Sequence, residues 1–473
     1  MIQPKLFNKN ASIFFILALI INFILLYFNT DNFFCEGLFK SHGEIAYNVY
    51  KYNSLKLNPI RSSALGQKDG RRTHYYEIDH EKYGPGTIYR NYNDSPWYGT
   101  LMGLIWKITN SLSFYDIRIF QIFLFSFLMF FLYQIAFLLF NSISAAILCC
   151  ISQLLFFPIF YLNVQLLRDI FPYYAAVILL YSILSYLLAN QKIHVLILNC
   201  ILVALIQLVR PTMGPMLLSF SFWLIIYGLL QKIYFKKIVQ FLSILWLANI
   251  LFFWVPTITY NRIAYGKNFV GVVGMNLLEG MGEFPNKWGC QLSDGWYSNF
   301  VNENFGKEAD KLGLAGNQRD IFFDQKAKET FCKWFKEEPW FYISSVLKRI
   351  PRLLLPGLPW FEYQDDQHIY LMYTTGTPIS EIFKIITRSP LILFDFIARH
   401  VYVGLFLLLA YIGMLLALID RKYLSLILVY LGIIVSSYIV IISHSEHRYL
   451  IPYYGLYCIF IGYALKKILC LKQ

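Results

Sequence analysis

Apolar runs long enough to cross a bilayer recur along the whole chain and constrain its fold more than any other feature. A membrane-spanning helix needs about 20 mostly apolar residues. Ten such runs are found, at 12–28, 114–140, 143–162, 170–189, 195–209, 213–230, 238–255, 401–419, 424–442 and 450–465. Because 57% of the 473 residues are hydrophobic and only 15% are charged, a soluble globule could not bury so much apolar surface. The sequence therefore predicts an all-α polytopic membrane protein of about ten spans.

The basic residues predict which side of the membrane faces the cytoplasm. Eleven Lys or Arg and one acid, Asp420, lie in the short segments 1–10, 190–194, 231–237, 420–423 and 466–473, whereas the short turns on the other face hold three arginines. Because cytoplasmic segments are enriched in Lys and Arg, both termini are expected in the cytoplasm. The first run has no small-residue cleavage site behind it and is expected to stay as an anchor. The net charge of +13 then has two readings: enrichment of basic residues on the cytoplasmic side, or a site for an anionic lipid or phosphate. No nucleic acid partner is expected.

This orientation places two long polar segments, 30–100 and 258–398, together on the outer face, where they hold 24 of the 28 acidic residues. The predicted organisation is a first span in 1–29, an outer loop in 30–113, a bundle in 114–257, a second outer loop in 258–398 and further spans in 399–473. Residues 97–108 are apolar but too short to span, and predict an interfacial or re-entrant helix with Trp97 and Trp106 at headgroup level. Residues 326–350 predict a helix interrupted at Pro339.

Three acids just beyond the first span, Asp31, Glu36 and Glu44, are the first candidate site. A carboxylate at a membrane–water boundary is partly desolvated, which raises its basicity and suits it to take a proton from a hydroxyl. The alternative is that each is an ordinary solvated loop charge.

The segment SHSEHRYLIP at 443–452 is the second candidate, because it packs two His, a Glu and an Arg into one outer turn. Arg448, with His447 beside it, has the geometry to grip a phosphate. The alternative is a snorkelling arginine paired with Glu446.

Other charges lie at span ends and in a glycine-rich loop. Ionisable groups at the ends of membrane spans are costly and are therefore functional candidates. These are Asp169, beside Arg168, and Arg210. A salt bridge at the helix end is the alternative for the adjacent pair. The segment 271–296 is expected to be a structured outer loop that helps to form a substrate cleft, with Glu279, Glu283 and Asp294 as minor candidates.

The chain contains no H-E-x-x-H, G-x-S-x-G or nucleotide-binding motif, and its cysteines and histidines lack metal-ligand spacing. No metal ligands and no other cofactor are therefore expected, and a divalent metal ion is the alternative that the sequence leaves open. An enzyme with its site on the outer face meets no cytosolic nucleotide sugar, so an activated donor would have to arrive on a membrane lipid phosphate.

Six stretches occur in a characteristic order: HGEIAYNVYKYNSLKLNP, NDSPWYGTLMGLIWKITNSLSFYDIRIFQIFLF, LVALIQLVRPTMGPML, WVPTITYNRIAYGKNFV, EEPWFYISSVLKRIPRL and EHRYLIPYY. In this order they resemble the GT-C superfamily, in particular the bacterial branch akin to protein O-mannosyltransferases and lipid A aminoarabinose transferases. Relatives often carry adjacent acids soon after the first span, whereas Asp31, Glu36 and Glu44 stand apart here.

The resemblance implies a GT-C-like bundle with two large extracytoplasmic loops in a bacterial inner membrane. It implies inverting transfer of a sugar from a polyprenyl-phosphate donor to a lipid, glycan or protein acceptor. Glu36 or Glu44 would be the base, Arg448 would bind the donor phosphate, and Arg210 matches the mid-chain Arg-Pro step. Since a helix N-terminus at Glu44 favours the charged carboxylate, the chemistry favours Glu36 as the base and Glu44 as a second carboxylate. A ligase or polymerase of lipid-linked glycans and a lipid or sugar transporter are the alternatives.

Overall fold

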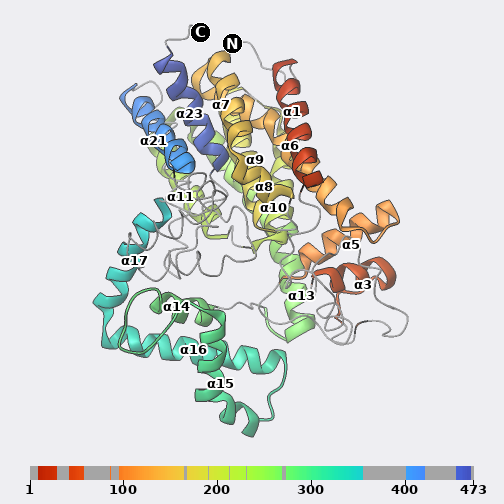
Figure 1. The fold of residues 1–473 in the computed structure, drawn as a ribbon, viewed down its shortest axis with the longest axis vertical. Helices are drawn as coiled ribbons and strands as arrows, with labels where there is room; N and C mark the ends of the chain where they lie inside the picture. The colour runs from red at the N-terminus through yellow and green to blue at the C-terminus, as the bar shows by residue number, and fades with distance from the viewer. Residues whose placement is uncertain are drawn as a thin grey trace, which may run out of the picture.

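The computed structural model describes residues 9–28, 42–57, 86, 95–164, 168–189, 191–211, 214–230, 232–268, 273–354, 401–420 and 454–469. Every element of regular structure in these ranges is helical, and no β-strand occurs among them. The predicted all-α fold is confirmed for this part of the chain (Figure 1).

Four helical segments are long and apolar enough to cross a membrane. They are α1 (Lys9–Phe28), α6 (Phe114–Phe140), α9 (Phe171–Leu188) and a continuous segment made of α12 (Phe235–Asn249), the π-helical turn η7 (Ile250–Trp254) and α13 (Val255–Tyr265). Shorter apolar helices accompany them: α7 (Ile143–Leu155), α10 (Ile193–Val209), α11 (Gly214–Leu230) and α21 (Val403–Ile419), with α23 (Tyr454–Ile468) near the C-terminus. The chain is therefore a helical membrane protein.

Two predicted spans differ in detail from the helices found. The run 143–162 is divided into α7 and α8 (Phe157–Val164), because Pro158 lacks the N–H that would continue the hydrogen bonds of α7. The run 238–255 instead continues as helix to Tyr265. Pro256 lies just after η7, and the wider π-helical turn accommodates its missing hydrogen bond. The predicted span 424–442 lies outside the described residues.

Pairs of residues in contact show how the membrane helices run relative to one another. α1 and α6 are antiparallel, since the Asn10 amide lies 3.4 Å from the Tyr133 hydroxyl while the Phe23 ring lies 6.3 Å from that of Phe123. The beginning of α1 and the end of α23 share one end of the molecule, and helices α14 to α16 lie at the opposite end (Figure 1).

α21 and α23 are a parallel pair. Gly413 lies against the carbonyl of Phe460, and farther along both helices Asp420 accepts hydrogen bonds from Tyr463 at 3.1 Å and Lys467 at 3.4 Å.

A separate unit is formed by α14 (Val273–Met281), α15 (Asp294–Lys311), α16 (Asn317–Glu337) and α17 (Pro339–Leu354). It is called the outer unit here after the outer loop 258–398 in which the sequence predicts it. It has small hydrophobic clusters of its own, around Leu278 and Tyr342. The predicted break at Pro339 is confirmed. The glycine-rich segment contains α14 and the start of α15, and between them lies a turn that Asn286 closes through hydrogen bonds to the backbone of Trp288 and Cys290.

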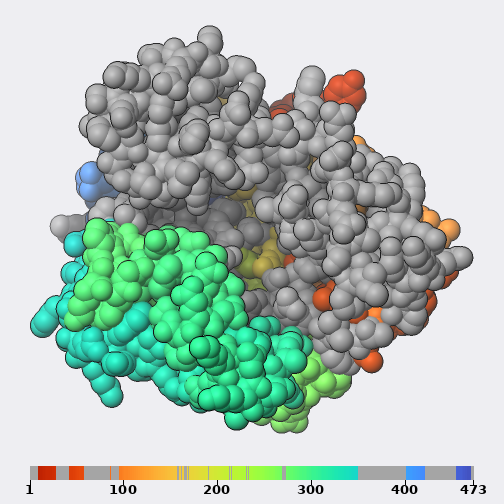
Figure 2. Space-filling view, turned by 60° about the horizontal axis from the view of Figure 1, so that its bottom comes forward, coloured from red at the N-terminus to blue at the C-terminus, as the bar shows by residue number. Residues whose placement is uncertain are grey.

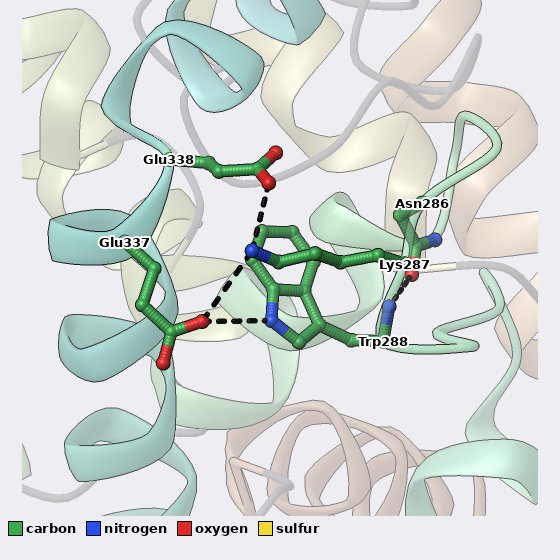
Figure 3. Close-up of polar contacts among 5 residues, drawn as sticks. All are labelled: Asn286, Lys287, Trp288, Glu337 and Glu338. Carbon is green, nitrogen blue, oxygen red and sulfur yellow. Dashed lines mark hydrogen bonds and ion pairs between the residues drawn. The ribbon is translucent and has the colours of Figure 1, made fainter.

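An exposed ion-pair cluster joins that turn to the α16–α17 break (Figure 3). Lys287 Nζ lies 2.7 Å from Glu338 and 3.7 Å from Glu337, and passes over the Trp288 ring at 5.0 Å. Trp288 stacks on Trp334 with ring centroids 5.3 Å apart. The cluster links this turn to the α16–α17 break at the surface of the outer unit.

Candidate functional site

A short helix at the end of the bundle carries the one predicted carboxylate near the first span that the structure describes. This helix, α3 (Glu44–Tyr52), packs on α5 (Trp97–Thr109), the helix predicted between the first two spans. Gly99 and Gly103 allow the contact, because a Cβ at Gly103 would lie 2.5 Å from the Ala46 carbonyl oxygen. The position of α3 is therefore fixed by close backbone packing.

Trp106 lies inside the protein. Its side chain is fully buried, and its indole N–H donates to the Ser113 carbonyl at 2.8 Å. It joins α5 to the start of α6 and offers no surface to lipid headgroups, so its predicted level in the membrane stays a prediction. Trp97, at the other end of α5, is partly exposed.

Glu44 is the first residue of α3, as the sequence predicts, and its side chain is completely buried. Asn48 Nδ2 donates to Glu44 Oε1 at 2.9 Å and also to the Lys56 carbonyl at 2.6 Å. The chain comes back to this point at Gly86, which packs closely on Lys56: a Cβ at Gly86 would lie 2.6 Å from the Lys56 carbonyl carbon. Glu44 follows the π-helical residues His42 and Gly43 directly, and Asn48 ties its carboxylate to the segment that follows α3.

An uncharged hydrogen-bond network anchors the start of α3 to the bundle. The buried His42 ring packs edge-on against Tyr98 at 5.2 Å, and the Tyr98 hydroxyl donates to Gln121 Oε1 at 3.2 Å. Gln121 Nε2 reaches the Asn163 carbonyl at 3.4 Å, and Asn163 Nδ2 donates to Asn22 Oδ1 at 2.9 Å. Residues of α1, α5, α6 and α8 thus meet beneath α3.

Arg118 is a candidate that the sequence interpretation missed. It lies one turn before Gln121 on α6, its side chain is buried, and its guanidinium lies 5.7 Å from the Tyr115 ring centroid. The sequence alone could have identified Arg118. Placing an arginine near the start of a mostly apolar span costs free energy, so such a residue is a functional candidate.

A groove of about 430 Å³ opens beside the end of α3, within the size range of ligand sites. It is lined by Asn53, Ser54, Leu55, Lys56, Trp97, Val255, Pro256, Thr259, Tyr260 and Ile263. One wall, after α3, offers hydroxyl, amide and ammonium groups. The opposite wall comes from α13, where Val255 and Ile263 are at least half exposed. Such a groove suits an amphipathic molecule.

The other predicted residues fall into two groups. Arg210 ends α10 near the site, because Ser95 Oγ donates to the Leu208 carbonyl at 3.4 Å just before α5 begins. Asp169 lies in the turn before α9 and Asp294 begins α15, but their side chains lie outside the described part of the structure. Asp31, Glu36, His447 and Arg448 also lie outside it.

Glu283 belongs to the outer unit. It forms an ion pair with Arg349, both side chains being fully buried, and Arg349 also donates to the Gly280 carbonyl. Burial lowers the pKa of Arg349, while the Glu283 carboxylate opposes that shift. Glu283 is thus held within the core of the outer unit, and Glu279 nearby is buried as well.

Among the described residues, no group of three or more His, Cys, Asp or Glu side chains could hold a metal ion. The view from the outer unit shows that this unit occupies one side and leaves part of the bundle visible beside it (Figure 2). No protein family, curated protein or solved structure matches the chain.

Proposed function

We propose that the protein is a membrane glycosyltransferase of GT-C-like architecture, which transfers a sugar from a polyprenyl-phosphate donor to an acceptor at the extracytoplasmic face. The observation that carries the proposal is the buried Glu44 carboxylate, tied through Asn48 to one wall of an amphipathic groove. A lipid-linked sugar has the two-part chemistry that this groove fits.

The donor would bind with its polar end toward Lys56 and its apolar chain along α13. Lys56 supplies a cation within the groove lining, and Val255 and Ile263 continue the apolar surface. Arg448 and His447, from the undescribed turn, together with Arg210, would hold the phosphate. Arginine suits this role because its planar fork binds two phosphate oxygens at once.

In the proposed reaction the acceptor hydroxyl oxygen attacks the anomeric carbon of the sugar. The bond from that carbon to the phosphate oxygen breaks, polyprenyl phosphate leaves with the electron pair, and a carboxylate takes the acceptor proton. Glu36 is the proposed base, with Glu44 orienting the acceptor or serving as the base itself. Since Glu44 is fully buried, the acceptor reaches it only when neighbouring side chains move.

The proposed topology has ten spans, both termini in the cytoplasm and the outer unit outside a bacterial inner membrane. It is supported by the antiparallel pair α1 and α6 and by the placement of Lys9, Lys192, Lys232 and Lys466 at helix ends that face one side. A cysteine at exposed Glu308 should react with an impermeant thiol reagent in intact cells. Protection there, with a cysteine at Lys232 labelled, would overturn the topology.

The described bundle gives little support to the alternative that the protein is a transporter. A transporter places its charged site near the middle of the membrane, often in broken helices. Within the described bundle helices the buried charge is Arg118, in the second turn of α6, and the deeper network is uncharged. These features support a site at the end of the bundle.

Purified full-length protein with labelled polyprenyl-phosphate sugars tests the proposal. Release of polyprenyl phosphate with transfer of one sugar supports it. Movement of an unchanged lipid across the membrane identifies a transporter, and transfer of a preformed chain identifies a ligase. Arg448→Ala should nearly abolish donor binding and Arg448→Lys should weaken it, since each charge-assisted hydrogen bond contributes about 1.5–3 kcal/mol.

A further inference from the structure

Basic residues gather at the end of the bundle where α9 passes into α10 and α11 passes into α12. Lys192 precedes α10, and Lys232 lies in the short turn η6 (Lys232–Tyr234) before α12. Lys236 and Lys237 are in the first turn of α12. Residues 170–278, which include all four lysines, contain no Asp or Glu. This stretch of the chain therefore brings positive charge to one end of the bundle without a carboxylate of its own to balance it.

A contact between α9 and α12 fixes the place of two of these lysines. Tyr186, near the end of α9, is buried, and its hydroxyl donates to Gln240 Oε1 at 2.5 Å. Lys237 Nζ, one turn before Gln240 on α12, lies 5.8 Å from the centroid of the Tyr186 ring, which attracts the cation. Lys237 is half-buried, and Lys236 beside it is exposed. Two ammonium groups are thus presented at one defined point between two helices.

This point is at the level where membrane-crossing helices end. The α12–α13 segment and α9 are both long and apolar enough to cross a membrane, and the contact joins the start of the first to the end of the second. Exposed apolar side chains adjoin the lysines, namely Phe235 and Val239 on α12 and Leu230 at the end of α11. Cations at a helix end with apolar surface beside them match the order of groups in a phospholipid, whose phosphate lies above its acyl chains.

We infer that Lys236 and Lys237, at the Tyr186–Gln240 contact, form a binding site for the phosphate headgroup of an anionic phospholipid. Exposed Gln240 adds an amide N–H donor at the same point, because its oxygen already accepts from Tyr186. The inference depends on the fold alone and is independent of the proposed reaction. A lipid bound here contacts α9 and α12 together, so it should also stabilise the folded bundle.

The chain offers a matched control at the same end of the molecule. Lys466 and Lys467 form an identical dipeptide in the last turn of α23. α6 runs parallel to α9, and its last residue, Phe140, stacks on Tyr463 of α23, so α9 and α23 end on the same side. Lys467 lies 3.4 Å from Asp420, whereas the site on α12 has no acid in its own stretch of chain. Removing either dipeptide changes the net charge equally.

The test measures lipid binding to detergent-solubilised full-length protein by native mass spectrometry. The probes are dioleoyl phosphatidylglycerol, which is anionic, and dioleoyl phosphatidylcholine, which has the same acyl chains and no net charge. The variants are Lys236→Gln/Lys237→Gln, the single exposed change Lys236→Gln, and the control Lys466→Gln/Lys467→Gln. Thermal unfolding with each lipid verifies that every variant is folded, and inorganic phosphate is added as a competitor.

The unaltered protein should bind phosphatidylglycerol more tightly than phosphatidylcholine and should gain thermal stability from it. A lysine near an anionic lipid contributes about fivefold in affinity, so Lys236→Gln should lose about fivefold and the α12 double variant about 30-fold. The α23 double variant should keep the affinity of the unaltered protein. Equal losses in the two double variants would overturn the inference, because positive charge anywhere at this end would then suffice.

Two further results would also overturn it. Unchanged phosphatidylglycerol affinity in Lys236→Gln, which tests the site even where the double variant does not fold, would place the lipid elsewhere. Displacement of phosphatidylglycerol by millimolar inorganic phosphate would identify a soluble anion as the ligand, since a bound lipid also keeps its acyl chains on the apolar surface beside the lysines.

Discussion

The two regions of the molecule each bury a glutamate, and they hold it in different ways. In the outer unit Glu283 meets the guanidinium of Arg349, and the pair joins two elements of one small core. At the end of the bundle Glu44 begins a helix, accepts a hydrogen bond from Asn48 and is tied through it to a groove. The Glu283–Arg349 pair connects parts of the outer unit, whereas the hydrogen bonds of Asn48 connect the Glu44 carboxylate to a groove where a ligand can bind.

The comparison teaches that burial alone does not mark a reactive carboxylate. A buried ion pair costs desolvation energy and contributes mainly when both partners are kept. Changes at Glu283 and Arg349 should therefore alter stability first, and changes at Glu44 should alter turnover first.

The largest expected effect is in Arg349→Met, which leaves Glu283 buried without its partner and should destabilise the outer unit by about 3–5 kcal/mol. Cys290 reports on this, because it is buried in the same unit and burial raises the pKa of its thiol to about 12. Its labelling by a thiol reagent should accelerate strongly relative to Cys332. Adding Glu283→Leu should restore much of the protection, and an unchanged labelling rate in Arg349→Met would contradict a structural role for the pair.

The next effect concerns the packing of α3 on α5. Gly103→Ala places a methyl group 2.5 Å from the Ala46 carbonyl oxygen. The overpacking should cost about 1–3 kcal/mol. Gly404→Ala in α21 is the matched control, because no atom lies within 4 Å of the point that its added methyl carbon would occupy. That change should be neutral or stabilising by up to about 1 kcal/mol, and equal thermal stability of the two variants in detergent would refute close packing at Gly103.

A comparable or smaller loss is expected for Asn48→Ala, which removes the amide from both Glu44 and the Lys56 carbonyl. Buried groups that lose a partner cost about 1–3 kcal/mol. Turnover should fall along with stability, because the link between Glu44 and the groove is lost. Normal turnover in a folded Asn48→Ala protein would show that this link has no part in the reaction.

The smallest effect is expected for Lys287→Met. Its ion pairs with Glu337 and Glu338 are at the surface, where water and salt screen them. Cys290 labelling should therefore match that of the unaltered protein. Acceleration approaching that of Arg349→Met would show that the exposed cluster, rather than the buried pair, holds the outer unit together.

The apolar runs predicted the membrane helices well because the bilayer selects for length and hydropathy directly. They did not predict the break at Phe156 or the extension to Tyr265, which depend on how a proline is accommodated in its local helix. The burial of Trp106 was not predicted, because its partner, the Ser113 carbonyl, is a feature of the folded chain.

At the candidate site, position along the chain was sufficient to include Glu44 among three candidate carboxylates, with Asp31 and Glu36. It could not reveal that Asn48 connects Glu44 to Lys56, or that Asn163 meets Asn22 from 141 residues away. The groove likewise combines α13 with the segment after α3, a contact that no local pattern encodes. Arg349 was missed for the same reason, since only the fold brings it to Glu283.

The most direct test of the account is single-turnover transfer from a saturating labelled polyprenyl-phosphate sugar by Glu44→Gln and Glu36→Gln, each in the full-length protein. Glu303→Gln, at an exposed site on α15, is the matched control. The account predicts a loss of about 10²–10⁴-fold in rate for the variant that lacks the base, with donor binding retained. Near-normal rates in both variants would contradict it and move the proton acceptor away from these two carboxylates.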